Sequence, residues 1–536
     1  PAETFFRGSP GGRRGSFRVV MNGLYRMEDR QVESTFTFDD EFLKKALKNI
    51  YSKEFHPMTD IEENLFEATW KTMNKATDKG FGARKPDDPD YDFYREIRTN
   101  NAVFAAFKVH RAQNDMAALL LDENGNLRPF EQWLKLIMPI ADHQMVDWLR
   151  TEYDTAVIRA HQAADWRQFE REKDILPNLK WMPSTSVHPG ADHRIFWGTI
   201  RPVNDPFWNE HRPGDRWNCK CGLSSTDEEP TPVPGSGPDN KPQPGLENNP
   251  GRDARLFSNS HPYQKEAHKG AKKAVDALTR RINGMIAEMP DNLTPEEKEA
   301  IALNNLKMEK ALGITKGKPM TVDKADKQNA NPKHREEYIL DPNGRYMDKS
   351  GHRYSKNPDY KPSDKQYAEN CQTCAPAYAL RLRGFDITAK GITTGSKLEY
   401  LSNGHAFEVW RNMDGTPAQH TSINSWLIAK GYQQMTPKRY MEFFNEVCRE
   451  EGVYELVIGW RGGSGHATIL QRFADGELRY IEPQSDNSKG SGMEWKDVRY
   501  LCDRGAANSH NCRGIMRIDN KLFNTDFSSI FDAGGV

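Results

Sequence analysis

The sequence predicts a multidomain protein with a mainly α-helical N-terminal part, a small loop-rich Cys/His module, and a C-terminal α+β domain. Three observations support this division. Apolar residues recur at helical spacing between about residues 40 and 175. Two polar stretches, 227–252 and 314–364, have a composition that buries little apolar surface. The clearest strand patterns, joined by a hairpin turn, follow residue 450.

Length, charge and cysteine content exclude several classes of protein. The chain of 536 residues suggests about three or four domains, and its net charge of -1 gives no bulk attraction for nucleic acid. The apolar runs are far shorter than the ~18 residues that a membrane span needs. Seven cysteines, none of them before residue 219, do not fit a disulfide scaffold. We therefore expect no membrane partner and no specific reading of nucleic acid, and we expect cysteines used for metal binding or catalysis.

The N-terminal region divides into an arm, a helical domain and a compact module. Residues 1–20 carry four Arg and no Met before Met21, so we treat them as a leader or disordered arm. Residues 21–226 form the next domain, whose amphipathic stripes we interpret as helical core. Within it, residues 178–223 are poor in aliphatic side chains and rich in Trp, Pro, Gly and His, which indicates a loop-rich module with short strands.

The rest of the chain divides into four segments. They are a Pro-rich linker at 227–252, a helical segment at 253–313, a second linker at 314–364 and a last domain at 365–536. The last domain opens with a Cys-containing helix that Gly384 ends as a C-cap, and antiparallel strands follow. A helix followed by such a sheet is typical of an α+β domain.

The loop-rich module contains donors that suit a metal ion. The candidate ligands are His188, His193, Cys219 and Cys221. Two imidazoles and two thiols form a set that tetrahedral zinc accepts, and a metal can replace part of a missing core. We therefore predict one structural Zn²⁺, with His211 and Asp192 as substitute ligands. The alternative is that these Cys and His residues are ordinary packing or surface residues.

The run from Trp181 to Cys221 resembles the signature of the phage Mu-like minor head protein, or head morphogenesis, family. That family carries a His or Cys pair, then PV-x-DPFW, then W-x-C-x-C, and the last two stand here at 202–208 and 217–221. The helix around 152–156 is similar to the family's lead-in, and the histidines are spaced more widely than in the usual pair. The resemblance covers about residues 40–320. It implies a virion component inside the phage head near the portal, with portal and other capsid proteins as partners and packaged DNA nearby.

The last domain opens with two cysteines in the run N-C-Q-T-C-A-P. Because Pro376 is tolerated only in the first turn of a helix, we place the N-cap at Thr373 and the first helical position at Cys374. A helix N-terminus favours a thiolate through its macrodipole. The pattern therefore favours Cys374 as a nucleophile, and Cys371 is the alternative.

A base and an orienting group for this cysteine lie further along the chain. His466 follows a Gly-rich run and begins a predicted strand, so its ring is accessible and held. Glu482 or Gln484 follows one hairpin later, which places either of them on the adjacent strand. A cysteine on a helix, followed by a histidine and an acid or amide on a sheet, is the papain-like arrangement.

The last domain also resembles the papain-fold toxin domains of polymorphic toxins. Those domains show an N-C-x-x-C helix opening, a G-H strand and a D-P-Q turn, which stand here at 370–374, 465–466 and 482–484, with Glu482 in place of the usual Asp. The resemblance implies a cysteine hydrolase that needs no cofactor and cleaves an amide. The reaction would be deamidation of a Gln side chain or cleavage of a peptide in a bacterial target protein, with a separate immunity protein as a further partner.

Taken together, the residues and both resemblances predict a phage minor head protein that carries a papain-like cysteine hydrolase toxin acting in the host bacterial cytoplasm. The alternatives are a head-maturation cysteine protease and a structural head protein with an inactive C-terminal domain. The C-x-x-C pair could also be a redox pair, or a zinc knuckle completed by Cys502, His510 or Cys512. We expect Cys448 to be a buried core thiol.

Overall fold

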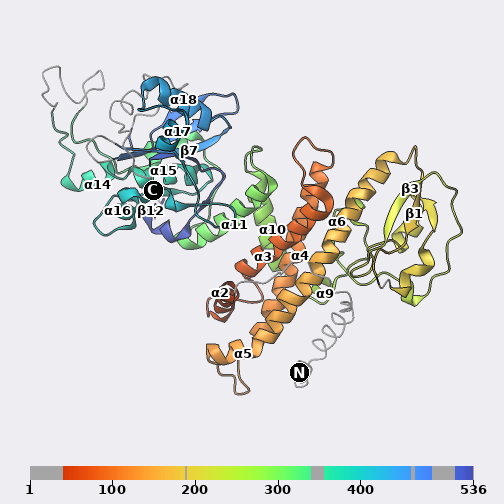
Figure 1. Ribbon diagram of the computed structural model, residues 1–536. Helices are drawn as coiled ribbons and strands as arrows, with labels where there is room; N and C mark the ends of the chain where they lie inside the picture. The colour runs from red at the N-terminus through yellow and green to blue at the C-terminus, as the bar shows by residue number, and fades with distance from the viewer. Residues whose placement is uncertain (1–39, 188–189, 340–354, 460–464, 486–512, 535–536) are drawn as a thin grey trace. The chain divides into compact units, whose positions relative to one another are not determined.

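A computed structural model describes residues 40–187, 190–339, 355–459, 465–485 and 513–534. The predicted arm at 1–20 lies outside these residues. The chain divides into two compact units, Pro1–Asn283 and Gly284–Val536, and the boundary falls inside helix α10 (Ala271–Ala287) (Figure 1). It therefore divides the helical segment expected at 253–313. Among the described residues, no helix combines the length and apolarity needed to cross a membrane.

The N-terminal unit is built on long helices, as the apolar spacing predicts. These are α2 (Asp40–Tyr51), α3 (Glu63–Thr77), α4 (Tyr91–Ala117), α5 (Phe130–Ala141) and α6 (Trp148–Glu172). Helices α3, α4 and α6 pack along one another, and their apolar stripes form the buried interior. Glu62 caps α3 by accepting a hydrogen bond from the Leu65 amide at 2.7 Å. The prediction of a helical core is confirmed for these elements.

A buried ion pair ties two of these helices together. Lys108 on α4 lies 3.0 Å from the carboxylate of Glu152 on α6, and both side chains are buried. The hydroxyl of Tyr263, on α9 (Pro262–Lys265), donates to Glu152 at 2.6 Å, and the Lys108 ammonium donates to the Gln144 carbonyl at 2.6 Å. Burial lowers the pKa of Lys108, while the charge of Glu152 opposes that shift. Loss of either charge would leave the other buried without compensation.

The Cys/His module folds around a small antiparallel sheet. Its strands are β1 (Asn178–Met182), β2 (Ile200–Pro202) and β3 (Gly222–Thr226), in the order β2-β1-β3. Two short helices, η4 (Ala191–Phe196) and α7 (Phe207–Glu210), complete the module. Its core is an aromatic cluster, in which Trp181 is fully buried and packs 5.0 Å from Phe196, measured between ring centroids.

The Pro-rich stretch at 227–252 is not the free spacer that its composition predicts. The guanidinium groups of Arg159 and Arg212 donate to the carbonyl oxygens of Leu246 and Asn248, and Leu246 is fully buried. An extended Pro-rich backbone makes few bonds to itself, so its carbonyls remain available to such donors. Buried arginines of helix α6 and of the Cys/His module, Arg159 and Arg212, therefore hold this stretch within the N-terminal unit.

The C-terminal unit is built on a five-stranded antiparallel sheet in the order β6-β10-β7-β8-β9. Its strands are β6 (Thr421–Ser422), β10 (Gly514–Arg517), β7 (Gly452–Gly459), β8 (Gly465–Arg472) and β9 (Leu478–Ile481). Two smaller pairs join β5 (Trp410–Arg411) to β11 (Leu522–Phe523) and β4 (Ile387–Ala389) to β12 (Phe531–Ala533). The strands and the hairpin expected after residue 450 are confirmed: β7, β8 and β9 are antiparallel neighbours, and a short turn joins β8 to β9.

Helices cover both faces of this sheet. Helix α15 (Cys371–Leu382) packs in one buried cluster with Val453 and Val457 of β7. Helices α17 (Ile423–Ala429) and α18 (Pro437–Val447) pack in a second cluster with Leu456 and Ile458, which point the opposite way from the same strand. Figure 1 shows α17 and α18 on one side of β7 and α15 on the other. Cys448 is fully buried in the second cluster, where a core thiol is expected.

Part of the predicted second linker belongs to the core of the C-terminal unit. Helices α12 (Val322–Ala325) and α13 (Lys327–Ala330) contact α15, and Ala325 and Ala330 are fully buried. Upstream, Asn304 of α11 (Pro295–Leu312) exchanges two hydrogen bonds of 2.9 Å with the Phe523 backbone. Composition misses these contacts because short polar helices can bury single small residues. The unit therefore begins well before residue 365.

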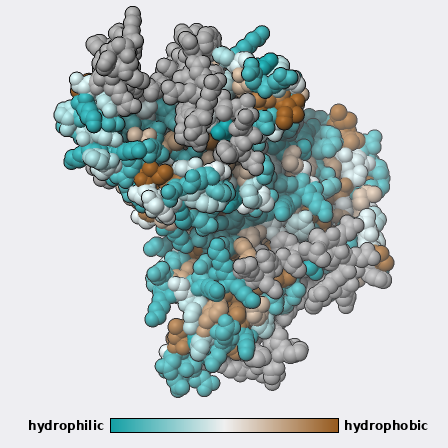
Figure 2. Space-filling view, turned by 60° about the vertical axis from the view of Figure 1, so that its left-hand side comes forward, coloured by the Kyte–Doolittle hydropathy of each residue, from teal (hydrophilic) through white to brown (hydrophobic). Residues whose placement is uncertain are grey.

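The outer surface is hydrophilic over most of the face in view. Figure 2 shows hydrophobic residues scattered in small groups between the residues drawn in grey. The large apolar side chains that are exposed, such as Ile175 and Ile428, lie on different elements. Single exposed apolar residues are normal for a folded protein.

Candidate functional site

Helix α15 begins three residues earlier than the proline argument predicts. Its first residue is Cys371 and its N-cap is Asn370, whose carbonyl accepts from the amides of Thr373 and Cys374 at 2.9 and 3.2 Å. The prediction of Thr373 as N-cap is therefore wrong, and Pro376 lies inside the helix. The local rule fails because Asn370 is fully buried and held by bonds from elsewhere in the fold.

The structure brings Cys371, His466 and Glu482 together. Cys371 lies beside the imidazole of His466 near the start of β8, and its thiol helps to raise the pKa of that imidazole. His466 Nε2 lies 2.6 Å from Glu482 Oε2, and Glu482 directly follows β9, the strand that pairs with β8. The start of α15 thus supplies the thiol, the start of β8 supplies the imidazole, and the end of β9 supplies the carboxylate.

The electrostatics of this group favour a charged imidazole. Burial lowers the pKa of His466, but the charge of Glu482, the hydrogen bond that the ring donates to Glu482, and the neighbouring Cys371 raise it well above its usual value overall. Glu482 is only 2% exposed, and it also accepts hydrogen bonds from the Tyr480 hydroxyl at 2.6 Å and the Gln484 amide at 3.2 Å. An imidazolium beside a thiol at a helix N-terminus stabilises the thiolate. Cys371 is 8% exposed.

The other two predicted residues have different partners. Cys374 is fully buried, its Sγ donates to Asn370 Oδ1 at 3.3 Å, and burial raises its pKa well above the usual value of a thiol. Gln484 Nε2 lies 3.4 Å from the same Asn370 oxygen. Both side chains therefore contact the N-cap residue of α15, whereas Glu482 contacts the imidazole. Cys502, His510 and Cys512, the knuckle alternatives, lie outside the described residues.

Sequence reasoning missed Asn331, Asn370 and Tyr480. Tyr480 lies two residues before Glu482 on β9, so strand alternation could have placed it beside that carboxylate. Asn370 precedes the first cysteine and could have been recognised as an N-cap. Asn331 follows α13 in a stretch with the composition of a linker, and no local signal connects it with Cys371.

The N-terminal unit contains a second constellation, which could hold a metal ion. One donor atom each from His193, Cys219 and Cys221 lies within 4.8 Å of the other two, and His193 Nδ1 is 3.3 Å from Cys219 Sγ. All three side chains are buried or nearly so. The predicted fourth ligand, His188, lies outside the described residues. Three of the four predicted ligands are thus brought together.

The substitute ligands are directed elsewhere. His211 Nε2 lies 3.2 Å from the Ser236 hydroxyl, and Asp192 lies 3.5 Å from the guanidinium of Arg216. The candidate metal group consists of one donor atom each from His193, Cys219 and Cys221. Neither His211 nor Asp192 belongs to this group.

The surroundings of the three donors fit a metal with thiolate ligands. His193 Nε2 donates to Oδ1 of Asp215 at 2.7 Å, and Asp215 is fully buried. This bond leaves Nδ1 free to face the two cysteines, as the second ring nitrogen of a metal ligand does. A hydrogen bond from Cys219 lowers the pKa of Cys221 to about 5 against the opposing effect of burial, while the pKa of Cys219 is raised. One thiolate is therefore available near neutral pH.

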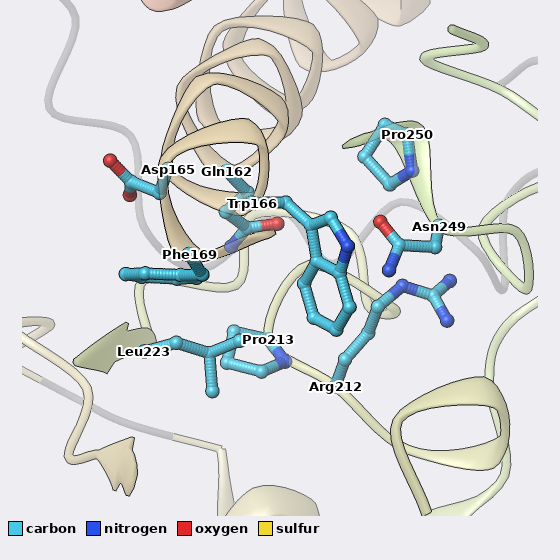
Figure 3. A pocket seen from close by; sticks show the side chains of 9 residues that line it. All are labelled: Gln162, Asp165, Trp166, Phe169, Arg212, Pro213, Leu223, Asn249 and Pro250. Atoms are coloured by element: carbon cyan, nitrogen blue, oxygen red, sulfur yellow. The ribbon is translucent and has the colours of Figure 1, made fainter. Parts of the chain in front are cut away.

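A small pocket of the N-terminal unit is lined by residues other than these donors. Figure 3 shows Trp166 near its centre, with Phe169, Leu223 and Arg212 around it. Within the described part of the chain, Arg212 Nε and Asn249 Nδ2 are buried without a hydrogen-bond partner. None of the lining residues supplies a thiol or an imidazole. The pocket therefore adds no reactive group to either constellation.

Comparisons with known proteins connect the N-terminal unit with phage heads. Residues 128–224 match the family model described as Phage Mu protein F like protein. A stretch of 80 residues is 29% identical to the Mu-like prophage FluMu F protein of Haemophilus influenzae, which is 15% of this chain and 19% of that relative. No solved structure matches the chain. The matched region contains the Cys/His module, and these similarities support the phage Mu F-like head morphogenesis family for this part of the protein.

Proposed function

We propose that the protein is a phage minor head protein whose C-terminal unit is a papain-like cysteine hydrolase. The observation that carries the enzymatic part is the Cys371–His466–Glu482 constellation, since a thiol, an imidazole and a carboxylate in contact are what nucleophilic catalysis requires. The head-protein part rests on the family similarity of residues 128–224. Because each unit has its own buried core, the two activities can be carried by one chain.

The proposed reaction begins with a Cys371 thiolate and a His466 imidazolium. Cys371 Sγ attacks the amide carbonyl carbon, and the amide of Cys371, at the first position of α15, has no acceptor within the helix and can donate to the oxyanion. His466 gives its proton to the leaving nitrogen as the C–N bond breaks, which leaves a thioester. His466 then takes a proton from water, whose oxygen attacks the thioester; the C–S bond breaks, and the carboxylic acid and the Cys371 thiolate are released beside the imidazolium. Glu482 holds the imidazole throughout.

Cys371, rather than Cys374, is the nucleophile in this proposal. Cys371 contacts His466, whereas the Cys374 thiol faces Asn370 and has a raised pKa. A thiol must ionise to attack, so burial without a charged partner makes Cys374 the weaker candidate.

The substrate we propose is an amide of a bacterial protein, either the side chain of a Gln or a peptide bond. This follows from the resemblance to polymorphic toxins. A chain of this kind would reside in the phage head near the portal, contact portal and capsid proteins, and act in the cytoplasm of the host. A separate immunity protein would protect cells that encode it.

We also propose that the metal group binds one structural Zn²⁺. His193, Cys219 and Cys221 supply three ligands of the types that zinc prefers, and Asp215 holds the imidazole in position. A bound zinc would supply folding stability to a module with few aliphatic residues.

Growth of bacteria that express the full chain tests the enzymatic proposal. We expect growth arrest with the wild-type chain and with Cys374→Ser, and normal growth with Cys371→Ser and His466→Ala. Equal growth with the wild-type chain and Cys371→Ser would refute the toxin. If phage head proteins are cut only when His466 is intact, the C-terminal unit is instead a maturation protease. The proposed hydrolase chemistry would then stand, but its substrate would be a head protein.

A further inference from the structure

Two buried asparagines lie directly behind the proposed nucleophile. Asn331 Nδ2 donates to Asn370 Oδ1 at 3.2 Å, and Asn370 Nδ2 donates back to Asn331 Oδ1 at 3.1 Å. Both side chains are fully buried. A reciprocal pair of amide hydrogen bonds fixes both side chains in orientation, because each amide has one donor and one acceptor end.

The rest of the hydrogen-bonding capacity of this pair is used on other segments. Asn331 Nδ2 also lies 2.9 Å from the carbonyl of Tyr367 and 3.2 Å from that of Gln484. Asn370 Nδ2 donates to the Lys390 carbonyl at 3.1 Å, and Asn370 Oδ1 accepts from Cys374 Sγ at 3.3 Å. The pair thus joins the end of α13, the start of α15, the chain after β4 and the turn after β9.

This arrangement reaches both halves of the catalytic constellation. Asn370 is the N-cap of α15 and directly precedes Cys371, so the bonds that hold its side chain fix the chain beside the nucleophile. The Gln484 carbonyl belongs to the turn that carries Glu482, and the Gln484 amide donates to Glu482 Oε1 at 3.2 Å. One amide, that of Asn331, therefore contacts the residue beside the nucleophile and the turn that holds the orienting carboxylate.

We propose that Asn331 and Asn370 are positioning residues that keep Cys371 in register with His466 and Glu482. The inference rests on the proposed hydrolase function. It adds that the hydrolase needs the segment around residue 331 to keep its catalytic residues in place. It also assigns a role to the second cysteine of the C-x-x-C run, since the Cys374 thiol donates to Asn370 and helps to fix it. Small displacements of a nucleophile reduce reactivity strongly, which makes such a clamp functionally important.

The test compares Asn331→Ala with Asn304→Ala in the full chain. Asn304 is a buried asparagine of the same unit whose amide makes two hydrogen bonds with the Phe523 backbone, away from the catalytic group. The rate of alkylation of Cys371 by iodoacetamide is followed against pH, with the modified site identified by mass spectrometry. Thermal unfolding of each variant reports the loss of stability. Asn331→Leu, which is similar in volume, serves as a second variant if the alanine variant does not fold.

We expect wild-type Cys371 to react near neutral pH in a manner that depends on His466. Asn331→Ala and Asn331→Leu should lower that rate by about 10-fold or more and shift reactivity toward alkaline pH, while Asn304→Ala keeps the wild-type profile. A wild-type profile in both Asn331 variants, or an equal loss in Asn304→Ala, would overturn the positioning role. A wild-type Cys371 that reacts like an ordinary thiol, with or without His466, would instead overturn the proposed hydrolase and the inference with it.

Discussion

Replacement of Glu482 by Gln tests the electrostatic basis of the proposed nucleophile. The substitution preserves size and a hydrogen-bond acceptor but removes the charge that lies 2.6 Å from His466 Nε2. That charge raises the pKa of His466 against the effect of burial. Without it, the imidazole loses its proton at a lower pH, so the window in which thiolate and imidazolium coexist disappears near neutral pH.

The size of the effect follows from the burial of the pair. Glu482 is 2% exposed, so the substitution withdraws the buried partner that stabilises the imidazolium relative to the neutral ring, a loss of about 3–5 kcal/mol. Since each 1.36 kcal/mol corresponds to about a factor of ten in rate, we expect Cys371 to react about 10²–10⁴-fold more slowly at neutral pH in Glu482→Gln.

The assay is the pH profile of Cys371 alkylation in the full chain, with Glu477→Gln as the matched control. Glu477 precedes β9 and pairs at the surface with Arg479 at 2.5 Å, so its loss removes a carboxylate from the same hairpin without touching His466. At high pH the variant and wild type should converge, because every exposed thiol ionises there. The reasoning would be refuted if Cys371 of Glu482→Gln were alkylated at the wild-type rate at neutral pH. It would also be refuted if Glu477→Gln slowed alkylation as much as Glu482→Gln does.

Three further predictions concern stability and metal binding. Asp215→Asn should weaken metal binding by about 10–100-fold, measured by competition with a chromogenic chelator, because it disturbs the partner of His193 Nε2. Glu152→Ala should destabilise the N-terminal unit by about 3–5 kcal/mol in urea unfolding, because it leaves the Lys108 ammonium buried without its counter-ion. A fragment of residues 365–536 should fail to give a cooperative thermal transition, whereas 284–536 should unfold cooperatively, because α11, α12 and α13 complete its core.

The pH dependence of stability in the C-terminal unit has a definite sign. Because His466 has a raised pKa in the folded state, its ion pair stabilises the fold below the ordinary titration range of histidine. That contribution falls as pH rises through the folded pKa. Glu482→Gln should flatten this fall, which the difference between wild-type and variant unfolding curves measures.

Much of the chemistry could be predicted from local patterns. The helical N-terminal region follows from apolar spacing, and the neighbouring positions of His466 and Glu482 follow from the register of one hairpin. The proximity of the two cysteines at 219 and 221 follows from their spacing alone. These features depend on residues close together in the chain, so sequence carries them directly.

Features that depend on distant partners could not be predicted in this way. Composition marks 227–252 and 314–364 as linkers, but buried arginines hold the first, and small residues such as Ala330 anchor part of the second in a core. Asp215 lies in an ordinary turn sequence, and only the fold places it beside His193. Hydrogen bonds between residues far apart in the sequence therefore order segments that composition alone predicts to be linkers.

The choice between the two cysteines shows the division most clearly. The sequence by itself predicted that a thiol would stand at a helix N-terminus and that a histidine would meet an acid or an amide, Glu482 or Gln484, one hairpin later. The tertiary structure decided where the helix begins: its N-cap is Asn370, whose side chain is bonded by Asn331, nearly forty residues upstream. A helix start depends on what satisfies its unpaired backbone and capping groups, and here those partners come from distant parts of the chain.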